Sequence, residues 1–203
     1  MTEPTLHAVV EINHGPTTWV ATPPSPWPDF VRLFKETLPA HISLILNTLA
    51  FYNSLSSDVP VLLPDALAQE DSLALPGGLA ATSGSRIIYP SCCSGLEEWR
   101  DWFKLLDGTG SPWLGHDPSP FVQSLAETFI VWPDGGLTEH LPSFPESISF
   151  TRSQLEAALK RVSVDLSDFV SVFQTWCNAN GIPSSEAIVQ NFSKSFLYNE
   201  HGA

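Results

Sequence analysis

Basic residues are scarce in this chain of 203 residues. Nine lysines and arginines stand against 22 aspartates and glutamates, which gives a formal net charge of −13. Two long intervals, from Glu36 to Ser85 and from Leu105 to Thr151, contain no lysine or arginine. An acidic surface repels the phosphates of nucleic acids, so we expect no direct nucleic-acid binding. The same charge would attract a basic protein and speed the encounter with it, although acidity also serves simply to keep a protein soluble.

Cysteines and long apolar runs are scarce as well. The three cysteines, two of them adjacent, do not form a disulfide framework, so reduced thiols are predicted. No apolar run approaches the ~20 residues that a membrane span needs. The first residues lack the basic start and apolar block of a signal peptide, and we expect a cytoplasmic protein. Hydrophobic residues make up 43% of the chain, which is enough for the core of a single domain over residues 1–203.

Motifs that specify a reaction are also missing. The glycine pairs Gly77-Gly78 and Gly135-Gly136 lack the spacing and the lysine of a phosphate-binding loop, and no serine stands in a GxSxG pattern. The sequence therefore indicates no cofactor, and a protein without catalytic activity is favoured over an enzyme.

The stretch from Arg86 to Gly136 has the clearest signals for where secondary-structure elements begin and end. A β-branched and aromatic run over 87–89, closed by a proline, predicts a strand. Ser94 precedes Glu97 by the spacing of a capping box. A short amphipathic helix is predicted after it, ended by an Asp-Gly pair, with one apolar face: Leu96, Trp99, Trp102, Phe103 and Leu106.

An irregular loop rich in proline and glycine is predicted to follow, and then a hairpin. Residues 109–120 carry too many prolines and glycines for a regular element. Residues 121–132 are predicted to form one strand, which turns at Pro133-Asp134-Gly135-Gly136 and returns over 137–141.

The first part of the chain mixes short elements. Residues 39–52 keep helical spacing, although 42–44 also alternate as in a strand; helix is favoured. The segment 74–85 is predicted to be a mobile loop because of its glycines. The remaining expectations are an opening hairpin pairing 6–13 with 17–21, a helix from Pro28-Asp29 that buries Phe30, Leu33, Phe34 and Leu38, and a short helix over 65–70.

The last third is predicted to be helical. A brief strand at 148–150 leads to Thr151 and Gln154, which repeat the capping-box spacing. A helix follows, with a possible shift of its apolar face at 163–165, and a last helix is expected over 185–197. The predicted fold class is α+β, with a mostly antiparallel sheet, an amphipathic helix in the middle and a helical C-terminal third.

Cys92 or Cys93 with His116 and Asp117 is the sharpest candidate for chemistry. A thiol at a helix start has a lowered pKa, and a nearby imidazole could activate it. The alternative is that the cysteines are small buried hydrophobes and that His-Asp-Pro is only a turn. A zinc site from Cys92, Cys93 and His116 with a fourth ligand, Cys177 or His140, is less favoured because adjacent cysteines match the CxxC spacing poorly.

Two function classes result. The first is a protein-binding module for a basic partner, in its most concrete form an immunity-type protein that neutralises a toxin. The alternative is a small enzyme that uses Cys93 and His116. Loop tryptophans either pin a loop or anchor an interface. The predicted partner-binding residues are Glu97, Glu98, Asp101, Asp107, Trp113 and Asp117.

Overall fold

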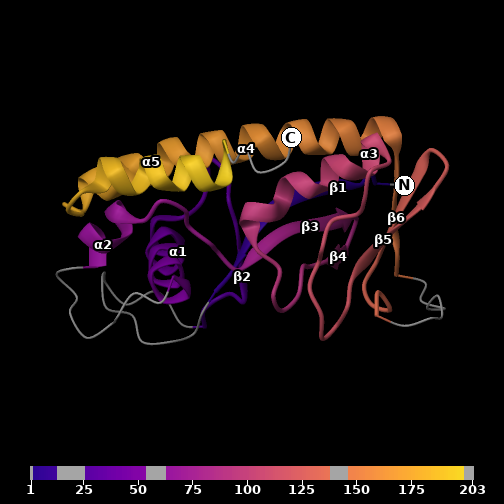
Figure 1. The fold of residues 1–203 in the computed structure, drawn as a ribbon, viewed down its shortest axis with the longest axis horizontal. Coiled ribbons are helices and arrows are strands. Elements are labelled where there is room, and N and C mark those ends of the chain that lie inside the picture. Colours follow the sequence, from indigo (N-terminus) through magenta and orange to yellow (C-terminus); the bar gives the residue numbers. More distant parts are fainter. Residues whose placement is uncertain (1, 13–25, 54–62, 138–145, 199–203) are drawn as a thin grey trace. The chain divides into compact units, whose positions relative to one another are not determined.

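The computed structural model describes residues 2–12, 26–53, 63–137 and 146–198. Within these residues the fold is α+β with two antiparallel sheets and a helical last third, as predicted (Figure 1). The strand orders are β2-β1-β3-β4 and β5-β6-β7. The strands are β1 (Thr5–Glu11), β2 (Phe30–Arg32), β3 (Gly77–Ser83), β4 (Arg86–Ile88), β5 (Phe121–Leu125), β6 (Thr128–Trp132) and β7 (Ile148–Thr151). The helices are α1 (Pro39–Tyr52), α2 (Leu63–Gln69), η1 (Leu96–Trp102), α3 (Phe103–Asp107), α4 (Arg152–Ala179) and α5 (Ser185–Phe196).

The chain forms two compact units. Unit 1 comprises Met1–Val9 and Gly77–Val164, and unit 2 comprises Val10–Pro76 and Asp165–Ala203. The divisions fall inside β1 and α4, so each of these two elements contributes to both units.

A buried strand replaces the mobile loop predicted over 74–85. β3 begins at Gly77 and is buried as far as Ala81, and it pairs with β4. A Cβ on Gly78 would lie 3.1 Å from the Ser94 hydroxyl, so this glycine permits close packing of the strand. The loop prediction was wrong because glycine, which loosens an exposed chain, also lets two buried segments approach.

The hairpin lies within the predicted 121–132 strand. β5 and β6 pair with Leu125 opposite Thr128, so the chain turns at Ala126 and Glu127 and not at 133–136. Asp134 instead accepts hydrogen bonds from the amides of Ser119 and Gly135, at 2.8 and 2.7 Å. These two bonds lower the pKa of its carboxyl. The predicted return strand lies largely outside the described residues.

The helix after Ser94 has a different geometry from the one predicted. Its N-cap is Gly95, without a side-chain cap, and Ser94 is buried, so the capping-box prediction was wrong here. The buried residues Leu96, Trp99, Trp102 and Leu105 are three apart, which is the period of a 3-10 helix and not of an α-helix. The segment accordingly folds as η1 and becomes α-helical only at α3. The predicted stop is confirmed by Gly108, which has φ 68°.

The second capping box is confirmed. The Thr151 hydroxyl accepts from the Gln154 amide at 3.3 Å, and the Gln154 side chain accepts from the Thr151 amide at 2.9 Å. α4 then runs without interruption, so the predicted shift at 163–165 does not occur. Val162 and Leu166 are four residues apart and continue the same buried face.

Unit 2 is mostly helical. The helix predicted from Pro28-Asp29 is wrong, because residues 30–32 form the strand β2. The helix predicted over 39–52 is α1, and those predicted over 65–70 and 185–197 are α2 and α5. Figure 1 shows α5 running alongside the end of α4, and their contact is aromatic: Phe169, Phe173, Phe192 and Phe196. The strand predicted over 6–13 is confirmed as β1, and its predicted partner at 17–21 lies outside the described residues.

Candidate functional site

Two loops of unit 1 are joined backbone to backbone at the predicted thiol site. The His116 amide donates to the Cys92 carbonyl at 3.1 Å, and the Ser91 amide donates to the Leu114 carbonyl at 2.8 Å. The Ser91 hydroxyl adds a bond to the His116 carbonyl at 2.9 Å. This isolated antiparallel bridge brings His116 to the cysteines.

Gly115 permits this approach of the loops. Its φ is +96°, and a Cβ there would overlap the carbonyl of Ser91. Only glycine combines that backbone conformation with the lack of a side chain. The predicted loop over 109–120 is therefore a close-packed partner of the cysteine turn.

The two adjacent thiols lie side by side. Cys93 has φ 67°, and the Sγ atoms of Cys92 and Cys93 are 3.3 Å apart. Both cysteines are exposed, so the prediction that they are small buried hydrophobes was wrong. The two sulfurs and a ring nitrogen of His116 all lie within 4.8 Å of one another.

Hydrogen bonds set the electrostatics of the cluster. His116 Nδ1 is 2.9 Å from Asp117 Oδ2. This bond, followed by the hydrogen bond with Cys93, raises the pKa of His116. The pKa of Cys93 is lowered first by its hydrogen bond with Cys92 and then by the one with His116. The arrangement thus favours a Cys93 thiolate beside a protonated imidazole.

Trp113 stands at the edge of the same cluster. Its indole N–H donates to the Cys93 carbonyl at 3.1 Å, and its ring centroid is 6.5 Å from that of His116. The side chain nevertheless remains 43% exposed. The carboxylate of Glu97 folds back over Gly95, two residues after Cys93. The structure therefore gathers three of the predicted partner-binding residues, Glu97, Trp113 and Asp117, around one turn.

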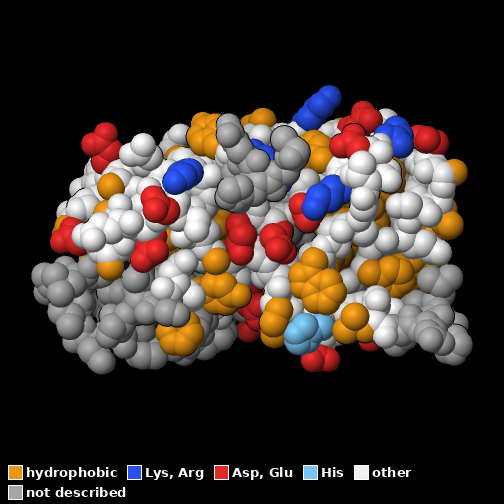
Figure 2. Space-filling model, viewed as in Figure 1, with side chains coloured by type: hydrophobic (Ala, Val, Ile, Leu, Met, Phe, Trp, Pro, Cys, Tyr) orange, Lys and Arg blue, Asp and Glu red, His pale blue; other side chains and the backbone are white. Residues whose placement is uncertain are grey.

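The other predicted partner-binding residues follow η1 and α3. Glu98, Asp101, Lys104 and Asp107 follow one another at intervals of three residues. Lys104 pairs with Asp101 at 2.9 Å. The charge of this row is thus partly neutralised within the unit. On the face drawn in Figure 2, carboxylates likewise lie singly or in small groups, several of them beside lysine or arginine side chains.

The predicted fourth zinc ligands do not join the cluster. Cys177 lies on the part of α4 that belongs to unit 2 and is fully buried, and burial raises the pKa of its thiol to about 12. His140 lies outside the described residues. In the described part of the chain, the candidate metal ligands are Cys92, Cys93 and His116.

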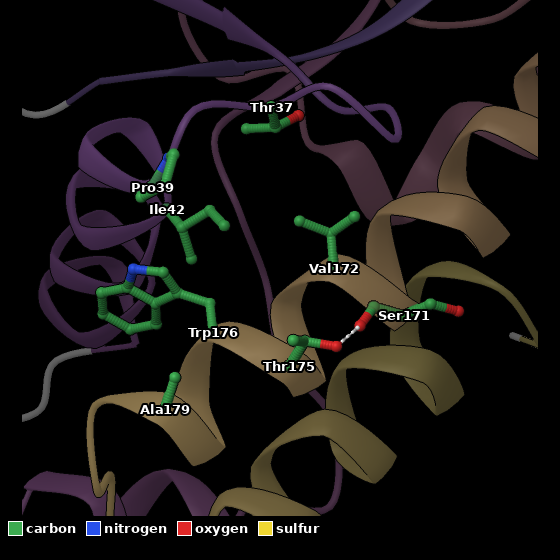
Figure 3. A pocket seen from close by; sticks show the side chains of 8 residues that line it. All are labelled: Thr37, Pro39, Ile42, Ser171, Val172, Thr175, Trp176 and Ala179. Carbon is green, nitrogen blue, oxygen red and sulfur yellow. Dashed lines mark hydrogen bonds between the residues drawn. The ribbon is translucent and has the colours of Figure 1, made fainter.

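Two hollows of the described residues are not lined by the thiols. In unit 2, α1 and α4 border an apolar cavity of about 440 Å³, shown in Figure 3, which is lined by Thr37, Pro39, Ile42, Ser171, Val172, Thr175, Trp176 and Ala179. The Thr175 hydroxyl is already bonded to the Ser171 carbonyl at 2.8 Å. Sequence reasoning missed this cavity, although small residues four apart on α4 (171, 175 and 179) were a visible sign of it.

The second hollow, in unit 1, surrounds an ion pair. Arg152 Nε is 2.6 Å from Glu127 Oε2, and Arg152 also donates to the Leu106 carbonyl at 2.8 Å. These bonds tie α4 to the β5–β6 turn and to α3. Neither hollow is lined by Cys92, Cys93 or His116.

The chain matches no protein-family model, no curated protein and no solved structure. In the described part of the chain, no helix combines the length and the apolar character needed to cross a bilayer. The functional argument consequently depends on the site itself.

Proposed function

We propose that this chain is a protein-binding module that receives a basic partner on the surface around Trp113. The observation that carries the proposal is the state of Trp113, which is held by a hydrogen bond to Cys93 and yet is 43% exposed. An aromatic side chain held in place and open to solvent is the usual anchor of a protein interface, because little conformational entropy is lost on binding.

The exposure of the surroundings supports a macromolecular partner. Small-molecule sites are concave and enclose most of their ligand. Here Cys92 and Cys93 are exposed, and the Asp117 side chain is 89% exposed. Neither of the two hollows described above contains these residues. An open surface of this kind suits another protein better than a substrate.

Charge supports a basic partner. The net charge is −13, and no lysine or arginine occurs between 105 and 151. Around Trp113 the carboxylates are those of Glu97 and Asp117, with Glu98 and Asp107 further along η1 and α3. Long-range attraction between an acidic surface and a basic protein accelerates their association. An immunity-type protein that neutralises a basic toxin in the cytoplasm, without contacting nucleic acid or membrane, is the most concrete form of the proposal.

Affinity capture followed by direct binding tests the proposal. The full chain is used as bait in an extract of its native host at low salt, and any basic protein captured is purified for a titration. We expect Trp113→Ala to weaken binding by about 2 kcal/mol or more, which is the effect typical of interface anchors. Glu98→Lys with Asp107→Lys should slow association and reduce its salt dependence.

Tyr198→Ala is the matched control. Tyr198 is an exposed aromatic residue of unit 2, 70% accessible, and is not one of the residues of the proposed surface. It should bind like the unmodified chain. Equal affinity of the Trp113→Ala and Tyr198→Ala variants for the captured protein would exclude the surface around Trp113.

A second candidate function is favoured by the convergence of Cys93, His116 and Asp117. A thiolate, an imidazole and an orienting carboxylate form the usual arrangement of a cysteine nucleophile. In this role Cys93 would attack an electrophilic carbon and His116 would protonate the leaving group. Loss of a measured turnover in Cys93→Ser, with capture of the partner unchanged, would favour this enzyme over the binding module.

A further inference from the structure

We propose that Cys92, Cys93 and His116 bind one zinc ion and leave its fourth coordination position to water. The inference is independent of the proposed partner, because it rests on ligands that the chain itself brings together. The three ligand atoms lie within 4.8 Å of one another at the surface of unit 1.

The turn at Cys93 removes the objection that adjacent cysteines cannot share an ion. In an extended strand, neighbouring side chains point to opposite faces. Cys93 instead has φ 67°, a left-handed conformation, and the two Sγ atoms are 3.3 Å apart. The spacing rule that favours CxxC presumes two cysteines in an ordinary turn, and this backbone departs from it.

The distances are close to those of a tetrahedral site. Zinc binds sulfur at about 2.3 Å and imidazole nitrogen at about 2.0–2.1 Å, so the ligand atoms of such a site are roughly 3.5–3.8 Å apart. The Sγ–Sγ distance of 3.3 Å is slightly shorter, and no pair of the three ligand atoms exceeds 4.8 Å. Adjustments of about 1 Å at exposed side chains would complete the geometry.

The surroundings match those of bound zinc. Metal-ligating histidines commonly bond their second ring nitrogen to a carboxylate, which fixes the tautomer. His116 Nδ1 is bonded to Asp117 at 2.9 Å, so Nε2 would be the nitrogen that binds the metal. The backbone bridge between Cys92 and His116 and the bond from Trp113 to the Cys93 carbonyl hold the ligands in place. Three protein ligands plus water is the pattern of an open zinc site.

Metal titration of the reduced full-length chain tests the proposal. Zinc is titrated in competition with a chromophoric chelator, and cobalt(II) is added separately as a spectroscopic probe. We expect one equivalent to bind and cobalt to show thiolate-to-metal charge-transfer absorption. Cys92→Ser, Cys93→Ser and His116→Gln should each weaken zinc binding strongly. Asp117→Asn should weaken it by roughly 10–100-fold, as expected for a residue that orients a ligand.

Cys177→Ala serves as the control because it removes a thiol that is buried in unit 2. Its zinc affinity should be unchanged, and circular dichroism of every variant checks that the fold is retained. The proposal is overturned if no equivalent binds. It is also overturned if His116→Gln binds with full affinity, which would indicate a site of thiols alone, or if the Cys92→Ser/Cys93→Ser double variant retains binding, which would place the metal elsewhere.

Discussion

The His116 amide donates a hydrogen bond to the Cys92 carbonyl at 3.1 Å. This bond joins the loop that carries His116 to the turn that carries Cys92 and Cys93. The bond forms because Gly115, the residue before His116, passes against the Ser91 carbonyl. Together with the two bonds that Ser91 makes to Leu114 and His116, this bond brings the thiols and the imidazole close to one another.

Gly115→Ala should separate the two loops. The new Cβ would overlap the Ser91 carbonyl, and overpacking of this kind destabilises by roughly 1–3 kcal/mol in addition to the strain of a positive φ. Gly108→Ala is the matched control: it also has a positive φ, 68°, but a Cβ there meets nothing within 4 Å. It should lose only roughly 1–2 kcal/mol. Denaturant unfolding measures both variants, and equal losses would contradict the role given to Gly115.

The thiols should differ sharply in reactivity. Cys93 has a lowered pKa, so its thiolate persists below the pH at which an ordinary thiol, with a pKa of about 8.5, ionises. Burial raises the pKa of Cys177 to about 12, so that thiol should stay protonated and unreactive in the folded chain. Alkylation of the native protein, followed by mass spectrometry against pH, should show Cys93 modified first and Cys177 only after unfolding.

The same alkylation profile tests the causes of the shift. Cys92→Ala removes the hydrogen bond that lowers the Cys93 pKa most, and His116→Gln removes the next. Each variant should move the alkylation midpoint to higher pH, Cys92→Ala further than His116→Gln. A midpoint unchanged in both variants would show that neither neighbour stabilises the thiolate.

The candidate site residues could be identified from the sequence, but their proximity in space could not be predicted from it. His116-Asp117 and the cysteine pair stood out by residue type alone. Their proximity depends on the conformation of Cys93, whose φ of 67° is rare for a residue with a side chain, and on the fit of Gly115. Neither the conformation of Cys93 nor the fit of Gly115 follows from the spacing of residues in the sequence. Spacing alone therefore predicts that adjacent cysteines are a poor pair of zinc ligands.

The fold shows a similar division. Elements with several agreeing signals were predicted, such as α4, where Thr151 and Gln154 cap a regular apolar face. Errors occurred where one residue type supports two structures. Glycine suggested a loop where β3 needs close packing, and apolar residues at 30–34 suggested a helix where β2 forms. Tertiary contacts decide such cases, and a single sequence does not contain them.

The aromatic contact between α4 and α5 should dominate the stability of unit 2. The Phe192 ring lies 5.7, 5.4 and 4.5 Å from the rings of Phe169, Phe173 and Phe196. Phe192→Ala should reduce the free energy of unfolding by about 3–5 kcal/mol, because it leaves a cavity at the centre of the cluster. Val164→Ala, at a position of α4 that is 58% exposed, should change it by less than about 0.5 kcal/mol. Similar values for the two variants in chemical denaturation would contradict this account.

A buried hydroxyl of α5 should matter more than an equivalent one two residues earlier. Ser195 is 4% exposed, and its Oγ accepts from the amide of Leu73 at 2.8 Å. Ser195→Ala leaves that buried amide without its acceptor and should destabilise by about 1–3 kcal/mol. The Ser193 hydroxyl donates to the Val189 carbonyl of its own helix at 2.8 Å, and that carbonyl also takes part in the helix itself. Ser193→Ala should therefore be nearly neutral, because alanine favours the helix. Hydrogen exchange at the Leu73 amide provides the decisive measurement: it should accelerate in Ser195→Ala and stay unchanged in Ser193→Ala, and equal exchange in both would show that the hydroxyl does not hold the 73–74 segment to α5.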